Sequence, residues 1–233
     1  MVPVAIYKYG RIRPGAFLRF RQRALARDLG ARLKRLIGQT ESGGFGPRPD
    51  VIAHSLGTLL LGLALRNDPT MQVGRIILLG SILRPDFNWK ELIKRGQVEA
   101  VLNNYGTEDF WALVAHYFIP DSGPSGRTGF NDRQDVINVA AEGFGHSDFF
   151  SSRFMTTQFE KLWRPFLTRR RDQLSSLLRE KGSSIQWRQA WWPLRANVTR
   201  LFLFSVAAAL ALLFLSSLVL GFMRTVRWVG SFI

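Results

Sequence analysis

The chain has 233 residues, of which 46% are hydrophobic and 21% charged, and 32 Lys and Arg against 17 Asp and Glu give a formal net charge of +15. This composition excludes a disordered chain and one that lies wholly within a membrane. The absence of cysteine excludes a disulfide framework, a thiolate metal site and a cysteine nucleophile, and the presence of only three histidines argues against an imidazole-rich metal cage. We expect no metal or organic cofactor.

The basic charge lies at the two ends of the sequence. The net charge is +8 over residues 1–50, −3 over residues 51–150 and +10 over residues 151–233. A basic chain can bind nucleic acid, but no recognised nucleic-acid motif supports that hypothesis here. We therefore predict no nucleic-acid partner and attribute the charge to attraction toward an anionic membrane surface.

The first predicted elements are a strand over residues 2–9 and a helix over residues 17–37. The strand is short, rich in β-branched and aromatic residues, and ends at Gly10. In the helix, leucines recur on one stripe and most basic residues lie off it. Residues 40–49 are Gly-rich but lack the Gly-Lys-Ser/Thr ending of a phosphate loop, so we predict a plain connector.

Strands then alternate with helices through the middle of the chain. Short apolar runs predict strands over 51–53, 75–79, 100–105 and 136–140, and helical patterns lie at 58–65, 87–96, 109–119 and 157–167. Such alternation indicates parallel pairing. The predicted fold class is α/β, with a mostly parallel sheet of about five strands and flanking helices. Residues 120–134 are rich in Gly, Pro and Ser, and we expect a mobile loop there.

A long uncharged segment lies near the C-terminus, at residues 201–223. A helix of this length reaches roughly 35 Å, enough to cross a hydrocarbon core of about 30 Å. Tryptophans lie on both sides of it, and the excess of Lys and Arg before it predicts a single-pass protein whose bulk is cytoplasmic. The predicted order is a domain at 1–167, a basic juxtamembrane segment at 168–200, the transmembrane helix at 201–223 and a short tail at 224–233.

The turn at residues 53–57 reads Ala-His-Ser-Leu-Gly, between a predicted strand and a predicted helix. A serine on a sharp strand-to-helix turn needs small neighbours, here Ala53 and Gly57, because its backbone is strained and its flanks are crowded. The turn exposes the hydroxyl of Ser55 and points the helix N-terminus at a developing oxyanion. A simple N-cap role for Ser55 does not explain the two small neighbours.

A serine nucleophile needs a base, and the base needs an orienting carboxylate. Glu108 and Asp109 follow one later predicted strand, and His146 lies in a Gly-flanked loop after the next one. The order serine, acid, histidine at strand ends is the one that accompanies this kind of turn. We favour Asp109 over Glu108 because it lies further beyond its strand, where a loop can turn it toward His146.

Three other polar residues receive structural roles. His54 lies beside the serine in the sequence, so we expect its side chain to point elsewhere. His116 is placed on a helix face, and Asp148 is expected to cap or hydrogen-bond locally.

These stretches resemble the α/β-hydrolase superfamily, in its lipase- and esterase-like branch. The resemblance covers about residues 2–167 and rests on residues 49–58, 103–111 and 145–150. It implies Ser55 as the nucleophile, His146 as the general base and acid, and Asp109 as the orienting carboxylate. It also implies that the Leu56 backbone N–H is one oxyanion donor.

The resemblance implies a membrane-anchored serine hydrolase that acts on a small-molecule or lipid ester through an acyl-enzyme. An acyltransferase would share the same three residues. The family places a further strand, and a loop with a second oxyanion donor, before the strand that residues 2–9 match. We expect these to be encoded upstream. The alternative is a shortened, catalytically impaired protein that serves as a membrane-tethered interaction module.

Overall fold

The computed structural model describes residues 5–7, 18–42, 48–168, 205, 212 and 214–217. The chain divides into two compact units, Met1–Ile185 and Gln186–Ile233. In the second unit the described residues are all helical and exposed.

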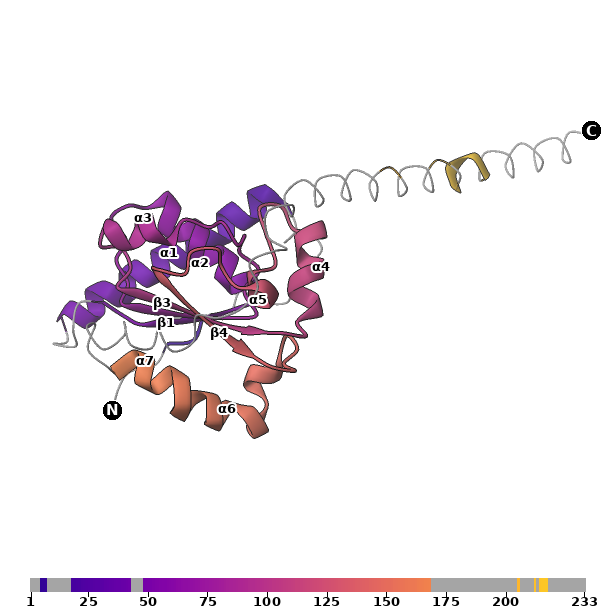
Figure 1. The fold of residues 1–233 in the computed structure, drawn as a ribbon. Coiled ribbons are helices and arrows are strands. Elements are labelled where there is room, and N and C mark those ends of the chain that lie inside the picture. The colour runs from indigo at the N-terminus through magenta and orange to yellow at the C-terminus, as the bar shows by residue number, and fades with distance from the viewer. Residues whose placement is uncertain are drawn as a thin grey trace, which may run out of the picture. The chain divides into compact units, whose positions relative to one another are not determined.

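The first unit contains a four-stranded sheet in which every strand is parallel to its neighbour (Figure 1). The strands, in their order across the sheet, are β1 (Val51–His54), β2 (Arg75–Leu79), β3 (Ala100–Gly106) and β4 (Val136–Ala141). The predicted α/β class with a parallel sheet is therefore confirmed. Because all strands run the same way, their carboxyl ends share one edge of the sheet.

The predicted strand over residues 2–9 is wrong where the structure describes it. Residues 5–7 belong to no strand. Ile6 is 77% exposed, and the Tyr7 hydroxyl donates to the carboxylate of Asp28 at 3.0 Å. The segment therefore contacts a helix instead of pairing with the sheet, and four strands rather than about five lie in the described part of the chain.

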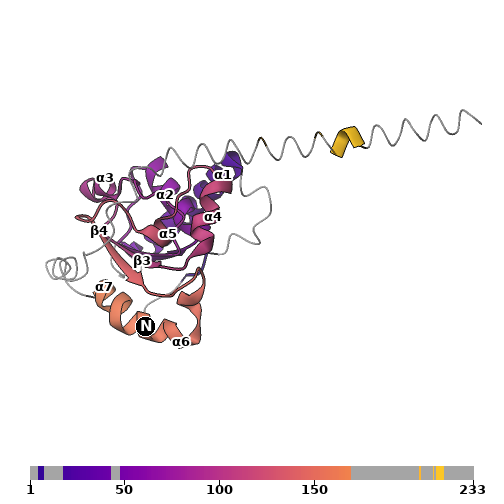
Figure 2. The same cartoon turned by 45° about the vertical axis from the view of Figure 1, so that its right-hand side comes forward.

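Helices cover both faces of this sheet (Figures 1 and 2). One face carries α1 (Arg19–Ser42), α2 (Leu56–Asn67) and α3 (Trp89–Lys94), and the other carries α6 (Ser152–Gln158), the π-helix η3 (Phe159–Trp163) and α7 (Arg164–Thr168). The first unit also contains α4 (Phe110–Phe118), α5 (Ser125–Thr128) and the 3-10 helix η2 (Asp148–Phe150).

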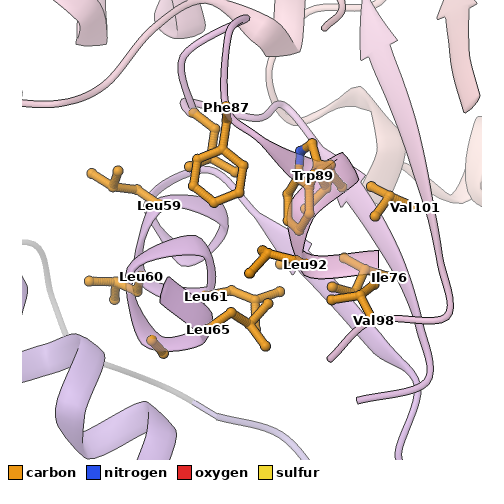
Figure 3. Packing of buried hydrophobic residues seen from close by; sticks show 14 of the residues in the cluster. Leu59, Leu60, Leu61, Leu65, Ile76, Phe87, Trp89, Leu92, Val98 and Val101 are labelled. Carbon is orange, nitrogen blue, oxygen red and sulfur yellow. The ribbon is translucent and has the colours of Figure 1, made fainter. Parts of the chain in front are cut away.

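The side chains of strand β2 show why helices pack on both faces of the sheet. All five of its residues are buried; Ile76 and Leu78 belong to one core cluster, whereas Ile77 and Leu79 belong to the other. Successive side chains of a strand point to opposite faces, so an unbroken apolar run is typical of a strand buried on both sides. In the first cluster, Figure 3 shows the rings of Phe87 and Trp89 packed beside the leucines of α2.

Residues 120–134, which we expected to form a mobile loop, are instead packed into the domain. They contain α5, whose Ser125 is fully buried and donates to Ser81 Oγ at 2.8 Å. The backbone N–H of Gly126 donates to the Ser81 carbonyl at 2.6 Å. A Cβ at Gly126 would come within 2.3 Å of the Ser81 nitrogen, so a glycine is needed for this approach. The Gly- and Ser-rich composition serves close packing here.

Within the described residues, no helix is both long and apolar enough to cross a membrane. Most of the predicted transmembrane helix at 201–223 lies outside the described residues, as do the tail at 224–233 and all of the juxtamembrane segment except Thr168. The membrane span therefore stays a prediction from the sequence.

Candidate active site

Ser55 lies in the turn between β1 and α2. Its backbone angles are φ 53° and ψ −126°, in the positive-φ region that residues other than glycine rarely adopt. Its N–H donates to the carbonyl of Leu79 at 3.1 Å, and its own carbonyl accepts the Thr58 hydroxyl at 2.7 Å. These bonds hold the strained residue from both sides, in the sharp turn that its small neighbours predicted.

The Ser55 hydroxyl lies 2.8 Å from Nε2 of His146. The other ring nitrogen of His146, Nδ1, lies 2.9 and 3.0 Å from the two carboxylate oxygens of Asp109. Each of the three residues follows a different strand, and all three lie at the carboxyl edge of the sheet. A carboxylate beside Nδ1 favours the tautomer with its proton there, which leaves Nε2 free to accept the serine proton.

Asp109 is fully buried, and a second contact fixes its orientation. It is the N-cap of α4, and its Oδ1 accepts the backbone N–H of Ala112 at 2.8 Å. Glu108, the alternative acid, is exposed and contributes only a backbone bond, from its N–H to the Phe144 carbonyl at 3.0 Å. The structure therefore brings Asp109 to His146 and leaves Glu108 outside the site.

Gly80, directly after β2, packs against the Asp109–His146 pair. It has a φ of +50°, and a Cβ there would lie 2.9 Å from His146 Nδ1 and 3.1 Å from Asp109 Oδ2. Both the backbone conformation and the available space therefore favour glycine. Gly80 was not among the residues that the sequence pattern predicted for the site. The sequence feature that could have indicated it is its position directly after a buried strand, at the edge of the sheet where the other site residues were expected.

His54 contacts the catalytic candidate His146, whereas we expected its side chain to point elsewhere. The two ring centroids are 4.7 Å apart, and His54 Nε2 lies 2.9 Å from the backbone carbonyl oxygen of His146. Burial lowers the pKa of His54, which favours a neutral ring that donates its Nε2 proton to that carbonyl. Phe150 packs edge-on against His54, with centroids 4.9 Å apart. His54 therefore supports the loop that carries the base.

The other two polar residues have local roles. Asp148 accepts the backbone N–H of Gly145 at 2.7 Å, which tightens the loop around His146. His116 lies on the buried side of α4, with Nδ1 2.8 Å from the Ser122 carbonyl. Both placements agree with the roles that the sequence suggested.

Leu56 is the first residue of α2 and is buried. Its backbone N–H has no partner within the helix, as is usual for a first turn, and it lies beside Ser55 at the positive end of the helix dipole. β1 is an outer strand of the sheet, and no strand that could provide a second donor precedes it in the described residues.

Among the residues that the structure describes, no cluster of three His, Asp or Glu side chains could hold a metal ion. Comparisons of the chain with known protein families, with curated proteins and with solved structures find no match. The fold and the arrangement of Ser55, His146 and Asp109 are therefore the features of this chain that point to a function.

Proposed function

We propose that this protein is a membrane-anchored serine hydrolase of the α/β-hydrolase kind that cleaves carboxylic esters. The observation that carries the proposal is the continuous hydrogen-bonded series from Ser55 through His146 to the buried Asp109. A nucleophile, a base and an orienting carboxylate in this arrangement are the components of acyl transfer.

The reaction takes place in two halves. Ser55 Oγ attacks the ester carbonyl carbon while its proton passes to His146 Nε2, and the carbonyl oxygen becomes an oxyanion. Collapse of this intermediate breaks the bond to the alcohol oxygen, which takes the proton from His146 and leaves an acyl group on Ser55. Water then attacks the acyl-enzyme with His146 as the base, and the acid product leaves as Ser55 recovers its proton.

The surroundings of Ser55 suit the charges that this reaction creates. The Leu56 N–H and the positive end of the α2 dipole would stabilise the oxyanion. Asp109 would stabilise the imidazolium that forms when His146 takes the proton. No step requires a metal or an organic cofactor.

The membrane part of the proposal comes from the uncharged segment at residues 201–223. Its length and flanking tryptophans favour a single span, and the basic residues before it favour a cytoplasmic active site. The substrate is a small-molecule or lipid ester.

Hydrolysis of short-chain nitrophenyl esters by the detergent-solubilised full chain tests the proposal. Ser55→Ala should lower kcat by about 10⁶-fold, and Asp109→Asn should lower it by about 10⁴-fold because the wrong tautomer of His146 becomes favoured. Two variants are matched controls: Glu108→Gln removes the neighbouring carboxyl, and Ser152→Ala removes an exposed hydroxyl. Both should retain the wild-type rate. A Ser55→Ala variant as active as the wild type would overturn the proposal.

The second candidate function is that of a membrane-tethered interaction module. The observation that favours it is that no strand precedes β1 in the described residues, so a loop that would supply a second oxyanion donor is not among them. Loss of one donor typically lowers turnover by about 10²–10³-fold. A folded wild-type chain with no ester turnover would support this module. An acyltransferase would be recognised by a new ester product when a second alcohol is added to the assay.

A further inference from the structure

Helix α4 directs its large apolar side chains outward. Five of them recur with the spacing of a single helix face: Phe110, Trp111, Val114, Tyr117 and Phe118. Three of them, Phe110, Trp111 and Phe118, are 58%, 63% and 61% exposed, and the other two are half-buried. The inward face is formed by Ala112 and His116, both buried.

A surface helix of a globular protein normally turns its apolar face to the core. Helix α4 does the opposite, and none of its residues is Asp, Glu, Lys or Arg. A contiguous exposed apolar surface of this kind marks a place of interaction.

The start of α1 extends this apolar surface. In both views the first turns of α1 lie beside α4 (Figures 1 and 2), and Arg19 forms an ion pair at 3.3 Å with Asp121, just beyond the end of α4. Leu18 and Phe20 next to this arginine are 49% and 64% exposed.

Uncompensated positive charge lies on the same part of α1. Arg21, Arg23 and Arg27 are exposed, and none of them pairs with an acidic side chain among the described residues. The ion pairs of α1 are formed by Arg19, Arg32 and Lys34 instead. The partner of this surface should therefore be both apolar and negatively charged.

We propose that these residues form a surface that docks on the anionic leaflet of a lipid bilayer. The α1–α4 surface, as we name it, consists of Leu18, Phe20, Phe110, Trp111 and Phe118 with Arg21, Arg23 and Arg27. Exposed Trp and Phe enter the headgroup region of a bilayer, and arginines beside them are attracted to anionic lipids. The proposal rests on the membrane anchor of the proposed function, which keeps a bilayer within reach.

Docking would bring the candidate active site to the lipid surface. Asp109 is the N-cap of α4, and its carboxylate accepts the backbone N–H of Ala112. Phe110 and Trp111 are the first two residues of the helix and therefore lie next to this carboxylate. The residues that enter the leaflet would thus be neighbours of the triad.

A fluorescent probe on the surface tests the proposal, and the absence of cysteine makes single-site labelling simple. Phe118→Cys is labelled with an environment-sensitive nitrobenzoxadiazole dye in the full chain, in phosphatidylcholine vesicles with or without phosphatidylglycerol. We expect blue-shifted emission and quenching by brominated lipid in the anionic vesicles. The control is Lys90→Cys on α3, an exposed position that is labelled with the same dye. Its emission should be that of a dye in water with both kinds of vesicle.

The charge requirement is tested by combining Arg21→Gln, Arg23→Gln and Arg27→Gln. Each arginine near an anionic leaflet raises the equilibrium constant for docking about fivefold. The triple variant should therefore lower the ratio of docked to undocked protein on the order of 100-fold. High salt should act in the same direction. The matched control removes equal charge elsewhere, with Lys90→Gln, Lys94→Gln and Arg153→Gln, and should dock as the wild type does.

Two results would overturn the proposal. One is a dye at position 118 whose emission in anionic vesicles is that of a dye in water. The other is a blue-shifted dye that brominated lipid does not quench, since the surface would then be covered by protein, either this chain or a second copy. Ester turnover in detergent is measured separately, so a Ser55→Ala variant that still docks separates this proposal from the proposed function.

Discussion

Gly80 connects the backbone of β2 to the chemistry of the site. Its positive φ and its closeness to Asp109 and His146 mean that a single added carbon would enter the space between them and the strand. Gly96 also has a positive φ, of +71°, but a Cβ there would meet no atom within 4 Å. A comparison of alanine variants at these two glycines therefore separates the effect of backbone strain from the effect of displacing Asp109 and His146.

Gly80→Ala should lower ester turnover by about 10²-fold or more, because displacement of a reacting group by about 1 Å has that effect. Gly96→Ala should lower the free energy of unfolding by about 1 kcal/mol through strain and leave turnover unchanged. The measurements are kcat and chemical unfolding for both variants. If Gly80→Ala matched Gly96→Ala in kcat, the packing of Gly80 on the pair would not matter for catalysis.

The environment of His54 predicts how the free energy of unfolding depends on pH. Burial lowers its pKa below the ordinary 6.5. When the pH falls through 6.5 toward the lowered value, the unfolded chain binds a proton that the folded chain does not, so the free energy of unfolding decreases. The stabilisation is complete above pH 6.5 and lost below the folded pKa.

His54→Gln removes this titration and can retain the N–H bond to the His146 carbonyl. The free energy of unfolding of the variant should therefore fall less between pH 7 and pH 5 than that of the wild type. Chemical unfolding at several pH values measures this, and the comparison cancels the titration of the other histidines. Parallel pH dependences for the two proteins would contradict a half-buried His54 that is neutral in the folded chain.

At the residue scale, local spacing was enough to predict which serine, acid and histidine could meet. Ser55, Asp109 and His146 each follow a strand that the sequence pattern located, and parallel strands bring such residues to one edge. The His54 contact could not be predicted, because its partner is a backbone carbonyl 92 positions away. The position of that carbonyl depends on the path of a loop, which no residue pattern specifies.

At the scale of elements, the buried strands were the most predictable part. Strands β1 to β4 begin where predicted and end within one residue of the expected position, because buried parallel strands have short, unbroken apolar runs. The exposed or irregular parts were less predictable. The closing helix expected at 157–167 consists of α6, the π-helix η3 and α7 in succession, and it starts at Ser152.

Helix α2 packs closely against its neighbours at a glycine, Gly62, and this contact leads to a prediction about stability. A Cβ at Gly62 would lie 2.9 Å from Leu83 Cδ2 and 3.1 Å from the Phe87 ring, whereas a Cβ at Gly38 in α1 would meet nothing within 4 Å. Alanine at Gly38 should raise the free energy of unfolding by about 0.5–1 kcal/mol through helix propensity.

Alanine at Gly62 gains the same propensity but overpacks the core, at a cost of about 1–3 kcal/mol. We therefore expect Gly62→Ala to lower the free energy of unfolding by about 1 kcal/mol. Chemical unfolding of the two variants gives the comparison directly. Equal stabilisation by both alanines would mean that α2 does not lie as closely against Leu83 and Phe87 as described.

At the scale of the whole molecule, the charge distribution and the fold have a common explanation in the proposed function. The slightly acidic middle of the sequence forms the sheet and carries the three site residues, whereas α1 carries exposed arginines. The sequence predicted parallel pairing, but the strand order and the exposed face of α4 depend on tertiary packing. An apolar nine-residue helix is equally compatible with a core position, so only the structure reveals that its aromatic side faces solvent.

The central claim is that His146 and Asp109 activate Ser55 as a nucleophile. Reaction of the folded chain with a fluorophosphonate, followed by mass spectrometry of the peptides, tests it most directly. We expect one adduct, on Ser55, which is lost in Ser55→Ala and forms far more slowly in His146→Ala. No adduct on the folded wild-type chain, or equal labelling of Ser55→Ala, would contradict it.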